Sequence, residues 1–87
     1  MRVKEVEEII FSSSREYGKE YFETTVIVEY EDYTEEEIPV KGIVIYSSVD
    51  DPIVKYCNEN LDPNIKSAVT KKVKKQIKDI IDRRPVI

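Results

Sequence analysis

The stretch YFETTVIVEY, residues 21–30, carries the clearest structural signal in this chain of 87 residues. Its residues alternate between two sets, which would lie on opposite sides of an extended backbone. One set is Phe22, Thr24, Val26, Val28 and Tyr30, and the other is Tyr21, Glu23, Thr25, Ile27 and Glu29. This period of two, with its many β-branched residues, is typical of a half-buried strand. We expect the Phe22 side of the strand to pack on the core.

A second strand is predicted from Val40 to Ser47, within the segment EIPVKGIVIYSS (37–48). Pro39 cannot donate a hydrogen bond to a neighbouring strand, so we expect it at an edge or a bend. The segment EDYTEE, residues 31–36, would form the turn between the two strands. Together these segments predict an antiparallel hairpin.

The first segment, VKEVEEIIF (3–11), is compatible with two structures. Its apolar residues fit a helix stripe, and they also fit a strand. We favour the strand, because a short serine-rich turn and then a suitable hairpin partner follow it. The turn SREYGKE (14–20) would be centred on Gly18.

Two Asp-Pro pairs, at 51–52 and 62–63, predict the starts of two helices. Aspartate is a favoured N-cap residue, and proline is favoured at the first helical position. We expect a short first helix over about residues 52–59 and a long second helix from about 63 to 83. In the short helix the inward residues would be Ile53, Val54 and Cys57. In the long helix the apolar stripe would comprise Ile65, Val69, Val73, Ile77, Ile80 and Ile81.

These elements predict a single small α+β domain over residues 1–87. Its architecture would be a three-stranded antiparallel β-meander followed by two helices packed on one face, in the order β-β-β-α-α. Charge divides the chain in the same way. Residues 1–48, the β-rich half, contain 5 basic and 12 acidic side chains, whereas residues 49–87, the helical half, contain 9 basic and 6 acidic ones.

Four lysines of the long helix, Lys71, Lys74, Lys75 and Lys78, project opposite its apolar stripe when the helix is drawn at about 100° per residue. Two pairs of them are four residues apart, and like charges at that spacing repel. We therefore predict an anionic partner for these lysines, either nucleic-acid phosphate or an acidic protein surface. Lysine binds phosphate as a point charge and reads no base sequence. The alternative is an ordinary solvated helix face.

A second charged feature lies around the predicted hairpin turn. Its carboxylates are Glu31, Asp32, Glu35, Glu36 and Glu37. They predict an acidic patch that docks on another protein, and the alternative is a solvated hairpin whose charge discourages edge-to-edge pairing. Tyr21 and Ile27, on the side of their strand away from the core, are candidates for a homodimer interface.

The residue inventory argues against catalysis. The chain has no histidine and a single cysteine, Cys57, which excludes histidine-based triads, histidine zinc sites and an internal disulfide. No acid, base and nucleophile converge in the sequence, so we expect no enzymatic activity, no cofactor and no metal site. Cys57 is predicted to be a small buried apolar residue.

The first residues and the overall composition indicate where such a protein would be found. The start, MRVKEVEEII, is interrupted by acids where a signal peptide would be apolar, and no apolar run is long enough for a membrane span, so we expect a cytoplasmic protein without membrane contact. The abundance of Ile, Val, Lys and Glu resembles that of small proteins from heat-adapted archaea or their viruses. The leading functional expectation is a small accessory protein that binds nucleic acid. The rival is an interaction module that modulates a host protein, as viral and plasmid proteins do.

Overall fold

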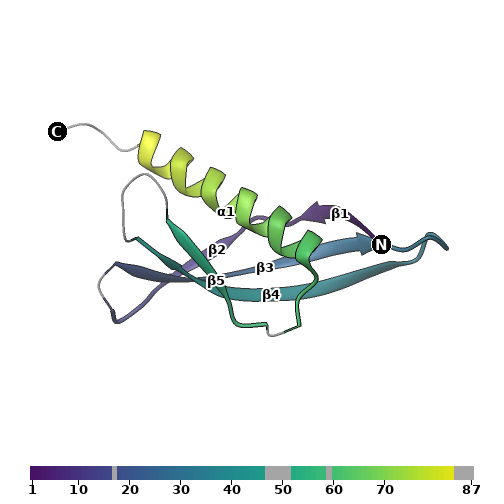
Figure 1. Cartoon of the computed structure of the whole chain (residues 1–87). Helices are drawn as coiled ribbons and strands as arrows, with labels where there is room; N and C mark the ends of the chain where they lie inside the picture. The colour runs from purple at the N-terminus through teal and green to yellow at the C-terminus, as the bar shows by residue number, and fades with distance from the viewer. Residues whose placement is uncertain (17, 47–51, 59, 84–87) are drawn as a thin grey trace.

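A computed structural model shows a single curled sheet with one long helix lying across one of its faces (Figure 1). It describes residues 1–16, 18–46, 52–58 and 60–83, with the backbone alone for residues 80–83. The elements are β1 (Arg2–Val6), β2 (Ile10–Ser13), β3 (Lys19–Glu29), β4 (Glu35–Ile45), β5 (Ile53–Tyr56) and α1 (Pro63–Arg83). The predicted α+β class is confirmed. The predicted count of three strands and two helices is wrong, because the described residues form five strands and one helix.

The centre of the sheet is the long β3–β4 hairpin, in which every residue of one strand pairs with a residue of the other. The Phe22 face of β3 is buried, as predicted. The turn is shorter than predicted, because β4 begins at Glu35, five residues before Val40. In the loop between the strands, the Tyr33 N–H donates to the Tyr30 carbonyl at 3.0 Å.

Pro39 lies within β4, yet on a stretch where β4 pairs only with β3, since β5 pairs with residues 42–45. The side-chain amide of Asn58 bonds backbone groups of β4 that have no neighbouring strand there. It donates to the Pro39 carbonyl at 3.2 Å and accepts from the Lys41 N–H at 3.1 Å. The prediction that Pro39 marks an edge is therefore confirmed.

The N-terminal segment is extended, which confirms the strand interpretation, but it is broken into β1 and β2. Both pieces pair with β3, and the register shifts at two places along them. One shift lies between Val3 and Glu5, and the other lies in residues 7–9, which stand opposite only two residues of β3. Extra residues of this kind bend a strand and increase its twist, so they account for the curl of the sheet.

The helix predicted over residues 52–59 is wrong, because Ile53–Tyr56 forms the edge strand β5, which pairs with Gly42–Ile45. Val54 and Tyr56 point toward the core while Ile53 is 46% exposed, which is the alternation of a strand. Cys57 is exposed, so its predicted burial is also wrong. The proposed cap Asp51 lies outside the described residues. Pro52 precedes the strand, where it removes no ladder hydrogen bond.

The long helix α1 forms as predicted and begins at the predicted residue. Asp62 is its N-cap, because its carboxylate accepts a hydrogen bond from the Asn64 N–H at 2.8 Å. The predicted apolar stripe is buried as far as it is described, which means at Ile65, Val69, Val73 and Ile77. The side chains of Ile80 and Ile81 lie outside the described residues.

The core lies between the concave face of the sheet and α1. Its buried hydrophobic residues are Ile9, Phe22, Val26, Val28, Val40, Val44, Ile65, Val69, Val73 and Ile77. Nine of these ten are valine or isoleucine, so this small core is built mainly from β-branched residues. Across the described residues, no helix is both long enough and apolar enough to cross a membrane.

Candidate functional site

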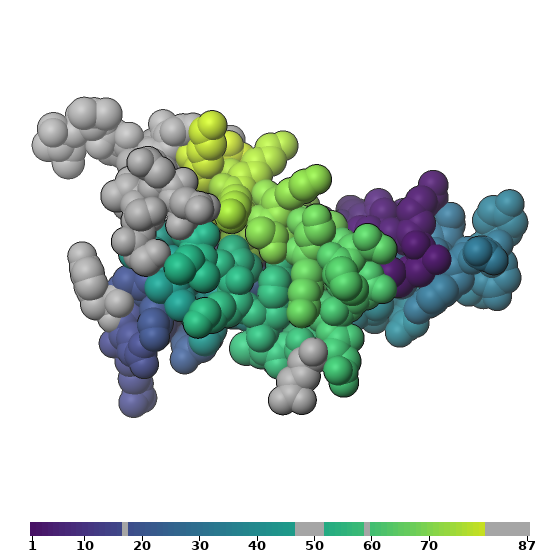
Figure 2. Space-filling model, in the orientation of Figure 1, coloured from purple at the N-terminus to yellow at the C-terminus, as the bar shows by residue number. Residues whose placement is uncertain are grey.

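The four predicted lysines lie where the sequence placed them, on the side of α1 that faces away from the sheet. We call Lys71, Lys74, Lys75 and Lys78 the lysine face. All four side chains are exposed, and Figure 2 shows α1 as a ridge along the surface of the molecule. Over the described residues, Lys71, Lys75 and Lys78 have no acidic side chain within ion-pair distance. Their charge is therefore available to an external anion.

An open groove runs beside the lysine face, between α1 and the N-terminal strand. It has a volume of about 820 Å³ and is lined by Val6, Glu8, Ala68, Lys71, Lys72, Lys75, Gln76 and Asp79. Lys71 and Lys75 therefore border the groove, whereas Lys74 and Lys78 do not line it. The groove carries three lysines against two acids, so its charge is mixed but basic overall.

Lys72 has a different role from the lysine face. Its Nζ donates to the Val6 carbonyl at 2.5 Å, and its side chain is half-buried. This contact joins α1 to the end of β1. Because its amino group is used in this contact, Lys72 does not belong to the lysine face.

Gln76 is a residue that the sequence interpretation missed. Its Oε1 accepts from the Ile9 N–H at 2.9 Å, and its Nε2 donates to the Ile9 carbonyl at 3.3 Å. The side-chain amide thus pairs with the backbone as a neighbouring strand would, at the break between β1 and β2. A signal was present, because Gln76 is the only glutamine in the chain and it lies between the apolar stripe and the lysines.

The acidic hairpin residues gather at the tip of the β3–β4 hairpin, which projects beyond α1 (Figure 1). Several of them form hydrogen bonds or ion pairs with nearby residues. Glu35 pairs with Lys4, and Glu36 accepts from the Tyr30 hydroxyl at 2.6 Å. Asp32 accepts from the Thr34 hydroxyl at 2.6 Å, a contact that together with the Thr34 N–H lowers the pKa of Asp32.

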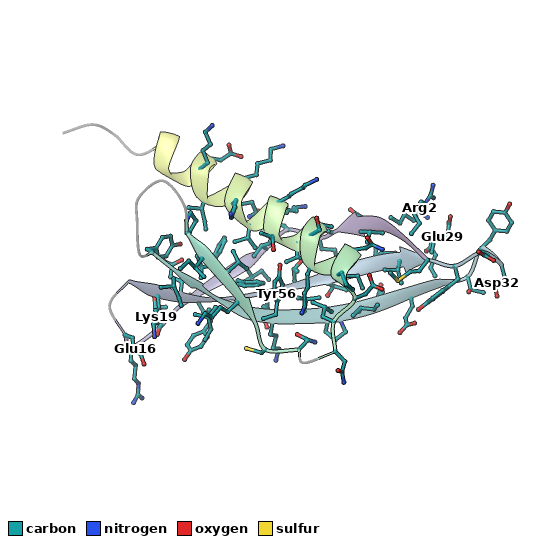
Figure 3. All side chains as sticks on the ribbon, in the orientation of Figure 1. Arg2, Glu16, Lys19, Glu29, Asp32 and Tyr56 are labelled. Atoms are coloured by element: carbon teal, nitrogen blue, oxygen red, sulfur yellow. The ribbon has the colours of Figure 1, made fainter. Side chains whose placement is uncertain are left out.

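Two basic residues of β1 compensate this acidic end. Arg2 pairs with Glu29 at 2.9 Å, and Figure 3 shows both side chains near the tip that carries Asp32. The hydrogen bond and charge of Glu35 raise the pKa of Lys4. Of the five predicted carboxylates, Glu31 and Glu37 make no hydrogen bond or ion pair with any described residue. The acidic patch is therefore smaller than the sequence suggested.

Tyr21 and Ile27 lie on the face of the sheet opposite α1, as predicted. Tyr21 is 48% exposed and Ile27 is half-buried. Ile27 lies directly opposite Glu37, one of the predicted acidic residues, whereas Tyr21 lies six residues farther from the hairpin tip. Tyr21 has Ile43 as its direct cross-strand neighbour, a grouping that the sequence interpretation did not contain.

The described residues contain no group of three or more histidine, cysteine, aspartate or glutamate side chains placed to hold a metal ion. No protein-family model, curated protein or solved structure matches this chain. Its function must therefore be argued from the two charged surfaces and the open face of the sheet.

Proposed function

We propose that this chain is a small non-enzymatic protein that binds the backbone of nucleic acid through the lysine face of α1. The observation that carries the proposal is the exposure of four lysines on one side of a helix whose other side is buried. From Lys71 to Lys78 they span about 10 Å of helix, at about 1.5 Å per residue. That length fits a few successive phosphates of one strand.

The chemistry of this surface supports contact with phosphates rather than with bases. Lysine is a compact point charge on a flexible stem, and its contacts with phosphates carry no sequence information. The amide side chain that could read a base, Gln76, is committed to the backbone of Ile9. The proposal is therefore for binding that depends strongly on salt and little on sequence.

The test is fluorescence anisotropy with a short labelled DNA duplex and with single strands of DNA and RNA, at about 50 mM and 200 mM salt. Four phosphate contacts predict a slope of about −3.6 in log affinity against log salt for a duplex, so affinity should fall about a hundredfold across this range. For a single strand the slope should be about −2.8. Replacing all four lysines of the lysine face by Gln should abolish binding.

A matched control removes the same charge elsewhere. Arg2, Lys4, Arg15 and Lys66 are changed to Gln, which lowers the net charge equally but leaves the lysine face intact. This control should keep most of the binding. The proposal fails if the folded wild type does not bind at the lower salt, or if the two variants lose binding to the same extent.

The second candidate function is docking on another protein through the hairpin tip. The observation that favours it is Tyr33, a residue that is 84% exposed at the end of the hairpin and has a backbone φ of 65°. That conformation is unfavourable for a bulky residue, and the exposed ring makes little packing to offset it. A pull-down with the immobilised chain tests this function. Proteins that the wild type retains should be lost from a variant that combines Tyr33→Asn, Glu31→Gln and Glu37→Gln. They should be retained by the lysine-face variant.

A further inference from the structure

The face of the sheet opposite α1 is left uncovered by the described residues. The register of the strands determines which side chains share it. Tyr21 lies beside Ile43, and Ile45 lies beside Ile53. Tyr21 and Ile53 are about half exposed, at 48% and 46%. They form an apolar cluster that the helix cannot shield, because α1 packs on the other face.

A charged pair stands next to this cluster. Glu23 of β3 is directly opposite Lys41 of β4, one step along the same face from Tyr21 and Ile43. Both charged side chains are exposed. Lys55 also lies beside Ile43, and Lys19 lies beside Ile45. The face therefore combines an aromatic ring and aliphatic side chains with one acid and three lysines, among which Glu23 and Lys41 are directly opposed. A single chain thus provides both halves of a complementary surface.

We propose that this face binds a second copy of the chain, with a two-fold axis parallel to the strands and midway between β3 and β4. Such an axis exchanges β3 and β4 and keeps each position along them. Every β3 residue of one copy therefore lies over its own β4 neighbour in the other copy. Tyr21 meets Ile43 of the second copy, and Glu23 meets Lys41 of the second copy. Each contact occurs twice, as in every two-fold interface.

The far end of the face sets the limit of the contact. There the same axis would place Glu29 over Glu35 of the second copy, and like charges repel. Arg2 and Lys4 partly neutralise these two carboxylates. Two packed sheets are also rotated by about 30°, so their ends diverge. The contact is therefore centred on Tyr21 and extends little beyond Thr25.

The sheet edges do not offer an equally good route to a dimer. On one edge, Gln76 and Lys72 occupy backbone groups of the N-terminal strand. On the other edge, β5 is only four residues long and carries the exposed Lys55. The part of β4 that extends beyond β5 contains Pro39 and three consecutive glutamates, which also oppose pairing. Short strands and edge lysines are both known to oppose edge pairing. A second copy is therefore expected on the face and not at an edge.

The size of the contact predicts its strength. The seven residues 19–25, at about 3.4 Å each, and four strands about 4.8 Å apart give roughly 450 Å² per copy. A standard stable interface buries about 800 Å² per partner. The contact is only about half that size, so we expect the dimer to be weak. The lysine faces lie on the outer sides of such a dimer, so the interface does not depend on the proposed nucleic-acid binding.

Sedimentation equilibrium over a wide range of protein concentration tests the interface. The mass of the wild type should rise with concentration from 10.2 kDa toward twice that value. Glu23→Lys alone should remain monomeric, because two lysines then face each other at each contact. Lys41→Glu alone should remain monomeric because two glutamates do. An equimolar mixture of the two variants should recover association, because each lysine then meets a glutamate.

Two matched charge reversals serve as controls. Glu31→Lys, at the hairpin tip, and Lys66→Glu, on α1, should associate as the wild type does. Circular dichroism melting of each variant establishes that it is folded. The interface is refuted if the wild type stays monomeric at the highest concentration. It is equally refuted if the single reversals still associate, or if their mixture fails to do so.

Discussion

At the scale of single residues, Gly42 shows how tightly the core is built. It pairs with Phe22 across β3 and β4, and the Phe22 ring lies over it. A Cβ at this position would lie 2.5 Å from two atoms of that ring and 2.3 Å from the Lys55 carbonyl oxygen. The vacant space lets Phe22 meet Tyr56 edge to face, with ring centroids 5.9 Å apart. Glycine is required here by close approach and not by backbone conformation.

Gly42→Ala should therefore be strongly destabilising for so small a change. Overpacking of a core typically costs 1–3 kcal/mol, and we expect about 2–3 kcal/mol because one of the crowded atoms is backbone. Urea denaturation measures the loss. Combining Gly42→Ala with Phe22→Leu should cost less than the sum of the two single changes, because the smaller side chain relieves part of the clash. Strict additivity would contradict this account.

Tyr56 connects β5 to α1 through its hydroxyl group, and Figure 3 shows it between the sheet and the helix. The hydroxyl donates to the Lys66 carbonyl at 2.8 Å. Its single proton is then used, so the Thr70 hydroxyl, 2.5 Å away, donates to the Tyr56 oxygen. Burial raises the pKa of Tyr56 above its ordinary value of 10.0, because a phenolate would be poorly solvated there.

This pKa shift predicts a loss of stability at high pH. Above about pH 10 the unfolded tyrosine ionises while the folded one keeps its proton, so the folded state binds more protons. The free energy of unfolding must then fall as the pH rises through the folded pKa, whereas below pH 10 it is unaffected by this group. Urea denaturation at several pH values from 8 to 11 should show the fall. In Tyr56→Phe the alkaline fall should be smaller, and an unchanged fall would exclude Tyr56 as its source.

At the scale of elements, the junction between α1 and the N-terminal strand depends on side chains that hydrogen-bond backbone groups, as a neighbouring strand would. Gln76 bonds both backbone groups of Ile9, whose side chain is buried at 4% exposure. Lys72 bonds the Val6 carbonyl, and Thr24 donates to the Glu7 carbonyl at 2.8 Å. At the break between β1 and β2, side chains thus bond the carbonyls of Val6, Glu7 and Ile9 and the N–H of Ile9. The bulge that curls the sheet is tolerated because the helix supplies partners.

Gln76→Leu should cost about 1–3 kcal/mol, because it leaves the N–H and carbonyl of Ile9 unpaired beneath the helix. Urea denaturation gives the total loss. Hydrogen exchange should show faster exchange at Ile9 than in the β3–β4 hairpin. Lys78→Leu, at an exposed position of the same helix, should change stability by less than about 0.5 kcal/mol. Equal effects of the two substitutions would refute the role assigned to Gln76.

At the scale of the whole molecule, opposite charges occupy separate places. The acids concentrate at the projecting hairpin and are partly neutralised by Arg2 and Lys4, while the lysine face lies on the opposite side of the helix from the sheet. The open sheet face is a third surface, with a mixed and self-complementary character. These separate positions allow nucleic-acid binding and self-association to be tested independently. The lysine-face variant and the variants at Glu23 and Lys41 change no residue in common.

The parts of the fold that depend on nearby residues were predictable. The β3 alternation and the Asp62 cap each act within a few residues, so β3 and α1 formed where expected. The exposure of the lysine face followed from the same helix periodicity. The position of Pro39 at a locally unpaired edge followed from its missing N–H.

Tertiary contacts decided the rest. An Asp-Pro pair stands just before both Ile53–Tyr56 and α1, yet Ile53–Tyr56 forms a strand. It does so because β4 offers it a free edge, from which Tyr56 reaches α1. The break between β1 and β2 depends on Gln76, which lies 67 residues from Ile9 in the chain. Likewise, Glu23 and Lys41 become neighbours only through the β3–β4 register. Local propensity cannot encode such pairings, since their free energy comes from backbone groups and surfaces that are distant in sequence.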